Sequence, residues 1–167
     1  MYEARKIANY LLWRFDAQEF SISNMKMNKL LYFVQGWGYV IEDKALIRNH
    51  FVAWEYGPVI KSIYDEFKHY VASPIAQPAK FMNYKSGVVE IVPFDDLDET
   101  CINVIEKIAP FYVEKTAAEL STITHKPGGP WETVRKSTGN EAALLQRIPN
   151  ALISECFRSE FGQKNKH

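Results

Sequence analysis

The chain has 167 residues, 47% of them hydrophobic and 14% aromatic, which is enough to fill one sizeable core and excludes disorder of the whole. Its 20 basic and 20 acidic residues cancel and are interspersed, so no basic footprint points to nucleic acid as a partner. No apolar run approaches the length that spans a bilayer, and the N-terminus lacks the apolar core of a secretion signal, so we expect a cytoplasmic protein with no membrane partner.

Two helices are predicted in the first quarter of the chain. An apolar stripe at a four-residue step predicts the first across roughly residues 1–18. Ser23 can cap the second, which is apolar almost all round over residues 29–37 and is therefore expected to be central. Gly36 and Gly38 lower helix propensity, which predicts that a neighbouring element approaches closely there.

The segment Ala-Trp-Glu-Tyr-Gly-Pro-Val at 53–59 joins two large aromatic side chains to a Gly-Pro pair. Gly57 can take a conformation closed to other residues, and Pro58 suits the first turn of a helix, so we predict a third helix from Pro58 to Tyr70. Such a corner is either a core anchor or a recognition site. The anchor is favoured because amphipathic aromatic residues occur in cores more often than in pockets.

The second half of the chain is punctuated by turns and caps. Residues 81–92 predict a small β-hairpin, which needs support from helices and should lie at their edge. Asp96 and Glu99 resemble a capping box that opens a fourth helix, and Pro110 is expected to end or kink that helix. Three further helices are predicted to begin near Thr116, Pro130 and Ile148.

These elements predict a mainly α (α+β) fold, a compact, single-domain, helical bundle-like body with a small β-hairpin at one edge. The chain has no internal repeat or convincing linker, so residues 1–162 are expected to form one domain, followed by a frayed polar tail at 163–167. Cys101 and Cys156 each lie in an apolar-periodic segment, which favours two buried thiols over a disulfide.

The residues that could carry chemistry are few. The four histidines are scattered and the two cysteines are far apart, so no metal site is predicted. Gly128 and Gly129 stand between prolines without the lysine and hydroxyl of a phosphate-binding loop, so no cofactor is predicted either. His125 lies at a helix end in a constrained Pro/Gly loop, but catalysis would require a nearby partner such as Ser121, Thr124 or Glu132. A histidine that hydrogen-bonds its loop to the body is the favoured interpretation, and we predict no catalytic residue.

Three segments taken together resemble the Panacea domain family, which includes the SocA-like antitoxins and phage-associated relatives. They occur in the family's order at 29–37, at 53–59 with 63–67, and at 124–127 through 130–131. The resemblance extends over about residues 7–161. It implies a mainly helical domain that is not an enzyme and that neutralises a protein toxin encoded nearby by direct binding, as in type II toxin-antitoxin pairs.

For the SocA-like branch, the resemblance also implies that the ClpXP protease takes part. Some relatives carry an added DNA-binding domain, but this chain starts almost directly at the shared region, so we expect none here. A hydrolase-like enzyme that uses His125 and a nucleic-acid-binding regulator remain as alternatives.

Aromatic residues near turns suit an interface, which places the expected contact surface at the 53–58 corner, the second helix and the 125–131 loop. The predicted partner-binding residues are Tyr32, Gln35, Trp54, Glu55, Tyr56, His125 and Trp131. Within the corner we expect Trp54, Gly57 and Pro58 to shape the domain. Glu55 and Tyr56 are the better candidates to face a partner.

Overall fold

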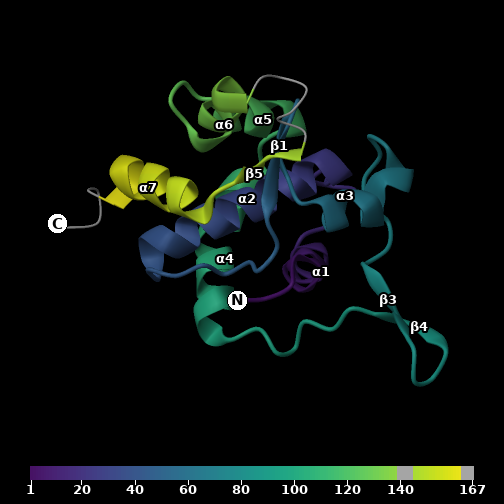
Figure 1. The fold of residues 1–167 in the computed structure, drawn as a ribbon. Helices are drawn as coiled ribbons and strands as arrows, with labels where there is room; N and C mark the ends of the chain where they lie inside the picture. Colours follow the sequence, from purple (N-terminus) through teal and green to yellow (C-terminus); the bar gives the residue numbers. More distant parts are fainter. Residues whose placement is uncertain (139–144, 163–167) are drawn as a thin grey trace.

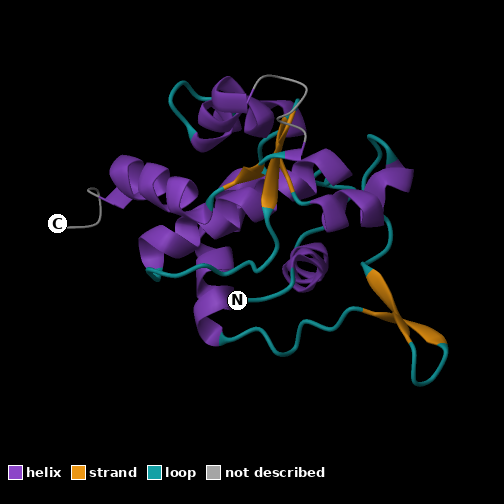
Figure 2. Ribbon diagram, in the orientation of Figure 1, coloured by secondary structure: helices purple, strands orange, loops and turns teal. Residues whose placement is uncertain are grey.

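The computed structural model describes residues 1–138 and 145–162, so the predicted polar tail lies outside the described residues. The α-helices are α1 (Ala4–Arg14), α2 (Asn24–Ile41), α3 (Lys61–Phe67), α4 (Glu99–Val113), α5 (Ala117–Thr124), α6 (Pro130–Thr138) and α7 (Asn150–Phe161). A 3-10 turn, η1 (Lys68–Tyr70), follows α3. The strands are β1 (Phe51–Trp54), β2 (Gly57–Val59), β3 (Lys80–Asn83), β4 (Val88–Ile91) and β5 (Arg147–Ile148). The mainly α fold class is confirmed (Figure 2).

Helix α2 runs through the middle of the fold, with α1 and α4 on one side and α5 and α6 on the other (Figure 1). Ser23 caps it as predicted, accepting a hydrogen bond from a main-chain amide of the first turn. A Cβ on Gly36 would lie 2.3 Å from the ring of Phe157, and one on Gly38 would lie 2.8 Å from Leu46 Cγ. Both glycines therefore permit the close approach that the sequence predicted.

The predicted third helix begins later than expected. Gly57 has the expected unusual conformation, with φ +106°. Pro58, however, lies in strand β2, where it pairs with Ala53 of β1, and α3 begins only at Lys61. Proline is tolerated in β2 because this strand is at the edge of the antiparallel sheet β2-β1-β5 and needs no second set of main-chain hydrogen bonds. The interpretation of Pro58 as a helix start was wrong.

Helix α4 also differs from its prediction at both ends. Its N-cap is Asp98, whose Oδ1 accepts a hydrogen bond from a main-chain amide at 2.8 Å, whereas Asp96 instead pairs with Lys6 Nζ at 2.5 Å. Pro110 does not end the helix, which continues for three residues. The last turn carries the buried Tyr112, whose packing offsets the main-chain hydrogen bond that proline removes.

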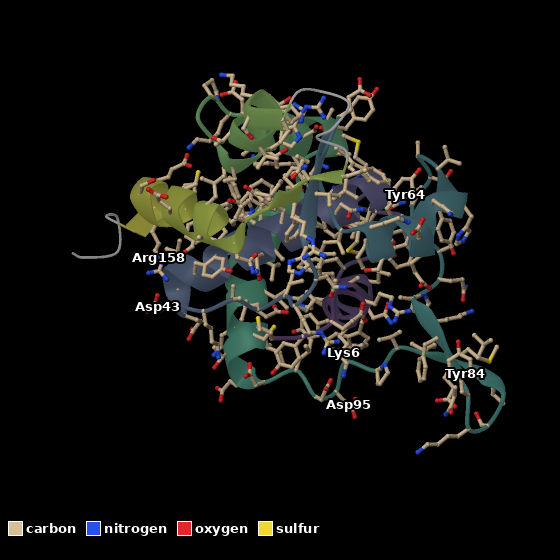
Figure 3. All side chains as sticks on the ribbon, in the orientation of Figure 1. Lys6, Asp43, Tyr64, Tyr84, Asp95 and Arg158 are labelled. Carbon is tan, nitrogen blue, oxygen red and sulfur yellow. The ribbon has the colours of Figure 1, made fainter. Side chains whose placement is uncertain are left out.

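The hairpin β3–β4 is confirmed and projects away from the helices (Figure 1). Tyr84, at its turn, is 94% exposed and lies at the far end of the molecule (Figure 3). Both cysteines are free, Cys101 buried and Cys156 partly so. Within the described residues, no helix is long and apolar enough to cross a membrane.

Candidate functional site

The three segments that carry the family resemblance meet at the turn between β1 and β2. Main-chain carbonyls along residues 53–58, which we call the clamped turn, accept hydrogen bonds from side chains of three helices. The pairs are Arg135 Nη1 with Ala53 O (3.1 Å), Trp131 Nε1 with Trp54 O (2.6 Å), Ser121 Oγ with Tyr56 O (2.8 Å) and Lys29 Nζ with Pro58 O (3.2 Å). Helices α2, α5 and α6 thus hold the main chain of the turn from inside the fold.

Gly57 is essential to this packing for two reasons. Its φ of +106° is strained for any residue with a side chain. A Cβ at this position would also lie 2.6 Å from Thr124 Oγ1 and 2.8 Å from Lys29 Cε. The turn therefore approaches α2 and α5 as closely as its main chain allows.

Lys29 lies beneath the clamped turn and is fully buried, with 0% of its surface exposed. Its bond to Pro58 O is the one hydrogen bond that its ammonium makes to the described residues. Burial lowers the pKa of Lys29 to about 7, because the charged form loses its hydration. Ammonium and neutral amine are therefore both populated near neutral pH.

His125 is the C-cap residue of α5, and its ring stacks on Trp131 with 3.7 Å between centroids and 16° between planes. Its Nε2 is buried and has no hydrogen-bond partner among the described residues. The pKa of His125 is lowered, mainly by burial and to a smaller extent by the charges of Lys29 and Arg135. The stack on Trp131, rather than the expected hydrogen bond, holds the His125 side chain in place.

The residues near His125 in the sequence do not form a catalytic group with it. The Ser121 hydroxyl donates to Tyr56 O, and the Thr124 hydroxyl donates to Ser121 O at 2.7 Å. Glu132 accepts from the Gly128 amide and pairs with a lysine of its own helix. Each of these side chains is thus hydrogen-bonded to another group, and none of them bonds to the buried Nε2 of His125.

The outward side of the clamped turn differs from its inner side. Tyr56 is 64% exposed and Glu55 is also exposed, whereas Trp54 is half-buried. The Trp54 ring packs edge-on against Tyr64 of α3, with 4.7 Å between centroids. Tyr64 lies on the outer side of α3 (Figure 3).

A pocket of about 570 Å³ opens beside the turn, between it, the start of α2 and the segment after α3. Its apolar lining consists of Met25, Trp54, Tyr56, Val59, Tyr64 and Val71. Its polar lining includes Asn28, Lys29, Glu55 and Lys68. A few polar groups within an apolar concavity are typical of a binding site, so this pocket and the clamped turn form our candidate site.

Two of the predicted partner-binding residues lie in the core and are corrected here. Tyr32 is 2% exposed and packs edge-on against Phe51. Gln35 is fully buried, and its Oε1 accepts from the amides of Leu46 and Ile47 at 3.0 and 2.8 Å. These side chains hold the core and the 46–47 segment together, so in this fold neither is available to a partner.

The structure brings the other five predicted residues together: Trp54, Glu55 and Tyr56 on the turn, and His125 and Trp131 behind it. Sequence reasoning missed the roles of Lys29, Ser121 and Arg135. A lysine inside a helix that is apolar all round was the one available signal, because a charge in a buried helix requires a partner.

Comparison with known proteins identifies the family of this chain. Residues 27–132 match the family described as antitoxin SocA-like, Panacea domain. The chain is also 31% identical over 156 residues to Antitoxin SocA from Caulobacter vibrioides (strain NA1000 / CB15N), an alignment that covers 93% of this chain and 82% of that protein. No solved structure matches. The family match and the relative both show that the chain belongs to the SocA-like Panacea domain family.

Proposed function

We propose that the protein is the antitoxin of a type II toxin-antitoxin pair, and that it neutralises a protein toxin encoded nearby by binding it directly. A relative that aligns over most of both chains is named as an antitoxin, which supports this role. The toxin contacts the clamped turn and the pocket beside it, through Trp54, Glu55 and Tyr56. His125 and Trp131 support that surface from behind.

The observation that carries the proposal is the clamping of the turn. Its carbonyls are hydrogen-bonded from inside, while Glu55 and Tyr56 extend outward. A loop fixed before binding loses little conformational entropy in the complex, so more of the interaction energy appears as affinity. Exposed tyrosine and half-buried tryptophan are the residue types that dominate binding energy at interfaces.

The same proposal includes a cytoplasmic location and delivery of the toxin to the ClpXP protease. If delivery takes place, the toxin should disappear faster in cells that hold both the antitoxin and an active protease. Toxin half-life, measured with and without the protease, tests this part separately from binding. An unchanged half-life would leave inhibition by binding alone.

Binding is tested by expressing the adjacent open reading frame with and without this chain, and scoring growth and co-purification. Tyr56→Ala should weaken toxin binding by about 30-fold or more, the effect expected of a central aromatic contact. Tyr84→Ala is the matched control, because Tyr84 is an exposed tyrosine on the distant hairpin. No toxicity, toxicity without rescue, or equal effects of the two variants would refute the proposal.

A further inference from the structure

The hairpin β3–β4 has a free edge along β4. At the base of the hairpin, the Val92 amide donates a hydrogen bond to Ala79 O at 3.0 Å. Hydrogen-bonded pairs alternate with other pairs along an antiparallel ladder, so in this register Val89 and Ile91 exchange no hydrogen bonds with β3. Their main-chain N–H and C=O groups therefore point away from the hairpin, toward the free edge.

The fold covers the start of the opposite edge but not this one. On β3, the Lys80 amide donates to Glu66 Oε1 at 2.9 Å, and Lys80 O accepts from Arg5 Nη1 at 3.0 Å. On β4, no described residue outside the hairpin forms a hydrogen bond with the main chain of Val89 or Ile91. A free strand edge is a template for pairing with another chain, and folded proteins normally cover or charge it.

The side chains of β4 are also those of a covered strand. Val88, Val89 and Ile91 are each 54% exposed, and they lie on both faces of the hairpin. Glu90 is the one charged residue of the strand. A strand that remains in water normally carries polar side chains on its solvated face, so the composition of β4 favours a partner along its edge.

We infer that two copies of the chain pair through β4, antiparallel and about a two-fold axis, so that their hairpins form one four-stranded sheet. A second copy offers an identical free edge, and two-fold dimers are the commonest assemblies of identical chains. The inference goes beyond the proposed function, because the hairpin lies at the opposite end of the molecule from β1 and the clamped turn (Figure 1).

Charge and main-chain chemistry select one register for this pairing. An axis at Glu90 would place two carboxylates directly opposite each other, which destabilises a strand pair. An axis at Ile91 would place Val89 opposite Pro93, which has no N–H to donate. An axis at Val89 avoids both faults. It pairs Val89 with Val89 of the second copy and places Val88 opposite Glu90.

In this register, the hairpin tip of each copy meets a pocket of the other. Ile91 lies opposite Gly87 of the second copy, so the tip at residues 84–87 lies beside residues 91–94. A pocket of about 600 Å³ opens there, and its lining includes Ile91, Phe94 and the 67% exposed Trp13. Tyr84 at the tip is 94% exposed in the single chain, and an apolar concavity suits its ring.

The charges at the tip and around the pocket are complementary. Lys85, next to Tyr84, forms no ion pair with a described residue. The same is true of Asp16, which lines the pocket, and of Asp95, which follows Phe94 and is exposed (Figure 3). Each tip thus brings an unpaired cation to unpaired carboxylates of the other copy, which favours the antiparallel orientation.

Sedimentation equilibrium of the full chain should show a monomer–dimer equilibrium with a Kd on the order of 10 μM, as expected for an interface at the small end of the size range. Hydrogen exchange locates the contact. The Val89 amide should exchange about fivefold more slowly at about 500 μM than at about 1 μM protein, whereas the outward Met82 amide of β3 should not change. A chain that stays monomeric at about 500 μM, or a dimer that protects Met82 instead, would overturn the inference.

Two proline variants form a matched pair. Val89→Pro and Met82→Pro replace the two members of one cross-strand pair, and each removes an N–H that points away from the hairpin. Val89→Pro should weaken dimerisation at least tenfold, whereas Met82→Pro should leave it within twofold. NMR shifts of the other hairpin amides verify that β3 and β4 still pair in both variants. Equal effects of the two variants would contradict pairing through β4.

A charge exchange tests the register without altering β4. Lys85→Glu should weaken the dimer severalfold, and Asp95→Lys in the same chain should restore most of the loss, because each tip again meets an opposite charge. A double variant that dimerises no better than Lys85→Glu would overturn the register. Tyr84→Ala should also weaken the dimer, although the clamped turn of each copy is unaltered. None of these measurements uses the toxin, so failure of the proposed function would leave this test intact.

Discussion

Replacing Gly57 by alanine should destabilise the domain more than the same change at an ordinary glycine turn. The φ of +106° imposes a conformational cost of about 1–2 kcal/mol on a residue with a side chain. The new Cβ would lie 2.6 Å from Thr124 Oγ1 and 2.8 Å from Lys29 Cε, and overpacking of this kind costs about 1–3 kcal/mol. Together these terms predict a loss of about 2–5 kcal/mol in the free energy of unfolding.

The matched control is Gly128→Ala, because Gly128 also has a positive φ, +72°, but nothing lies within 4 Å of its added Cβ. The free energy of unfolding of Gly128→Ala should fall only by the conformational cost of the positive φ, about 1–2 kcal/mol. Urea unfolding of both variants measures the difference, provided that the m-value is unchanged. Equal losses in the two variants would show that the turn does not press against α2 and α5 as described.

Three further predictions concern the groups around α2. The pKa of Lys29 is about 7 in the folded protein and 10.5 in its ordinary state, so between these values the unfolded chain binds more protons and stability rises with pH. Lys29→Met should remove that rise, which is at most about 1.4 kcal/mol per pH unit, in unfolding curves measured from about pH 7 to 9.5. Trp131→Phe keeps an aromatic ring at this position but removes the indole Nε1–H that donates to Trp54 O at 2.6 Å, and should cost about 1–3 kcal/mol in urea unfolding. Gly36→Ala should destabilise by about 1–3 kcal/mol despite the better helix propensity of alanine, and Phe157→Leu should relieve part of this loss in a double-mutant cycle.

The fold could be predicted where periodicity and capping agree. As predicted, α5 follows Thr116, which forms a capping box with Glu119, α6 begins at Pro130, and α7 begins two residues after Ile148. The error at α3 has a physical cause. Val59 is buried like Ile63 and Phe67, so its four-residue step resembles a helix, but Val59 is the last residue of an edge strand. A pattern of buried residues alone therefore does not distinguish the start of a helix from the end of an edge strand.

The site could be predicted only in part. The exposure of Glu55 and Tyr56, and the inward position of Gly57, agree with what the sequence suggested for this corner, whereas their contact with a toxin stays a prediction. The clamping was beyond sequence reasoning. The donor to Ala53 O is Arg135, 82 residues away, and no local pattern indicates which side chain will meet which carbonyl.

The two roles considered for residues 53–58, core anchor and recognition site, concern different parts of the segment. The main chain of residues 53–58 is the anchor, because its carbonyls are hydrogen-bonded to α2, α5 and α6. The side chains of Glu55 and Tyr56 are exposed, and neither makes a hydrogen bond or ion pair to another described residue. The cost is concentrated at Gly57, where any side chain would be strained, and at Lys29, which is buried and has no counter-charge among the described residues. Departures from the local rules of stability tend to mark functional sites, and here Gly57 lies within the exposed turn and Lys29 directly beneath it.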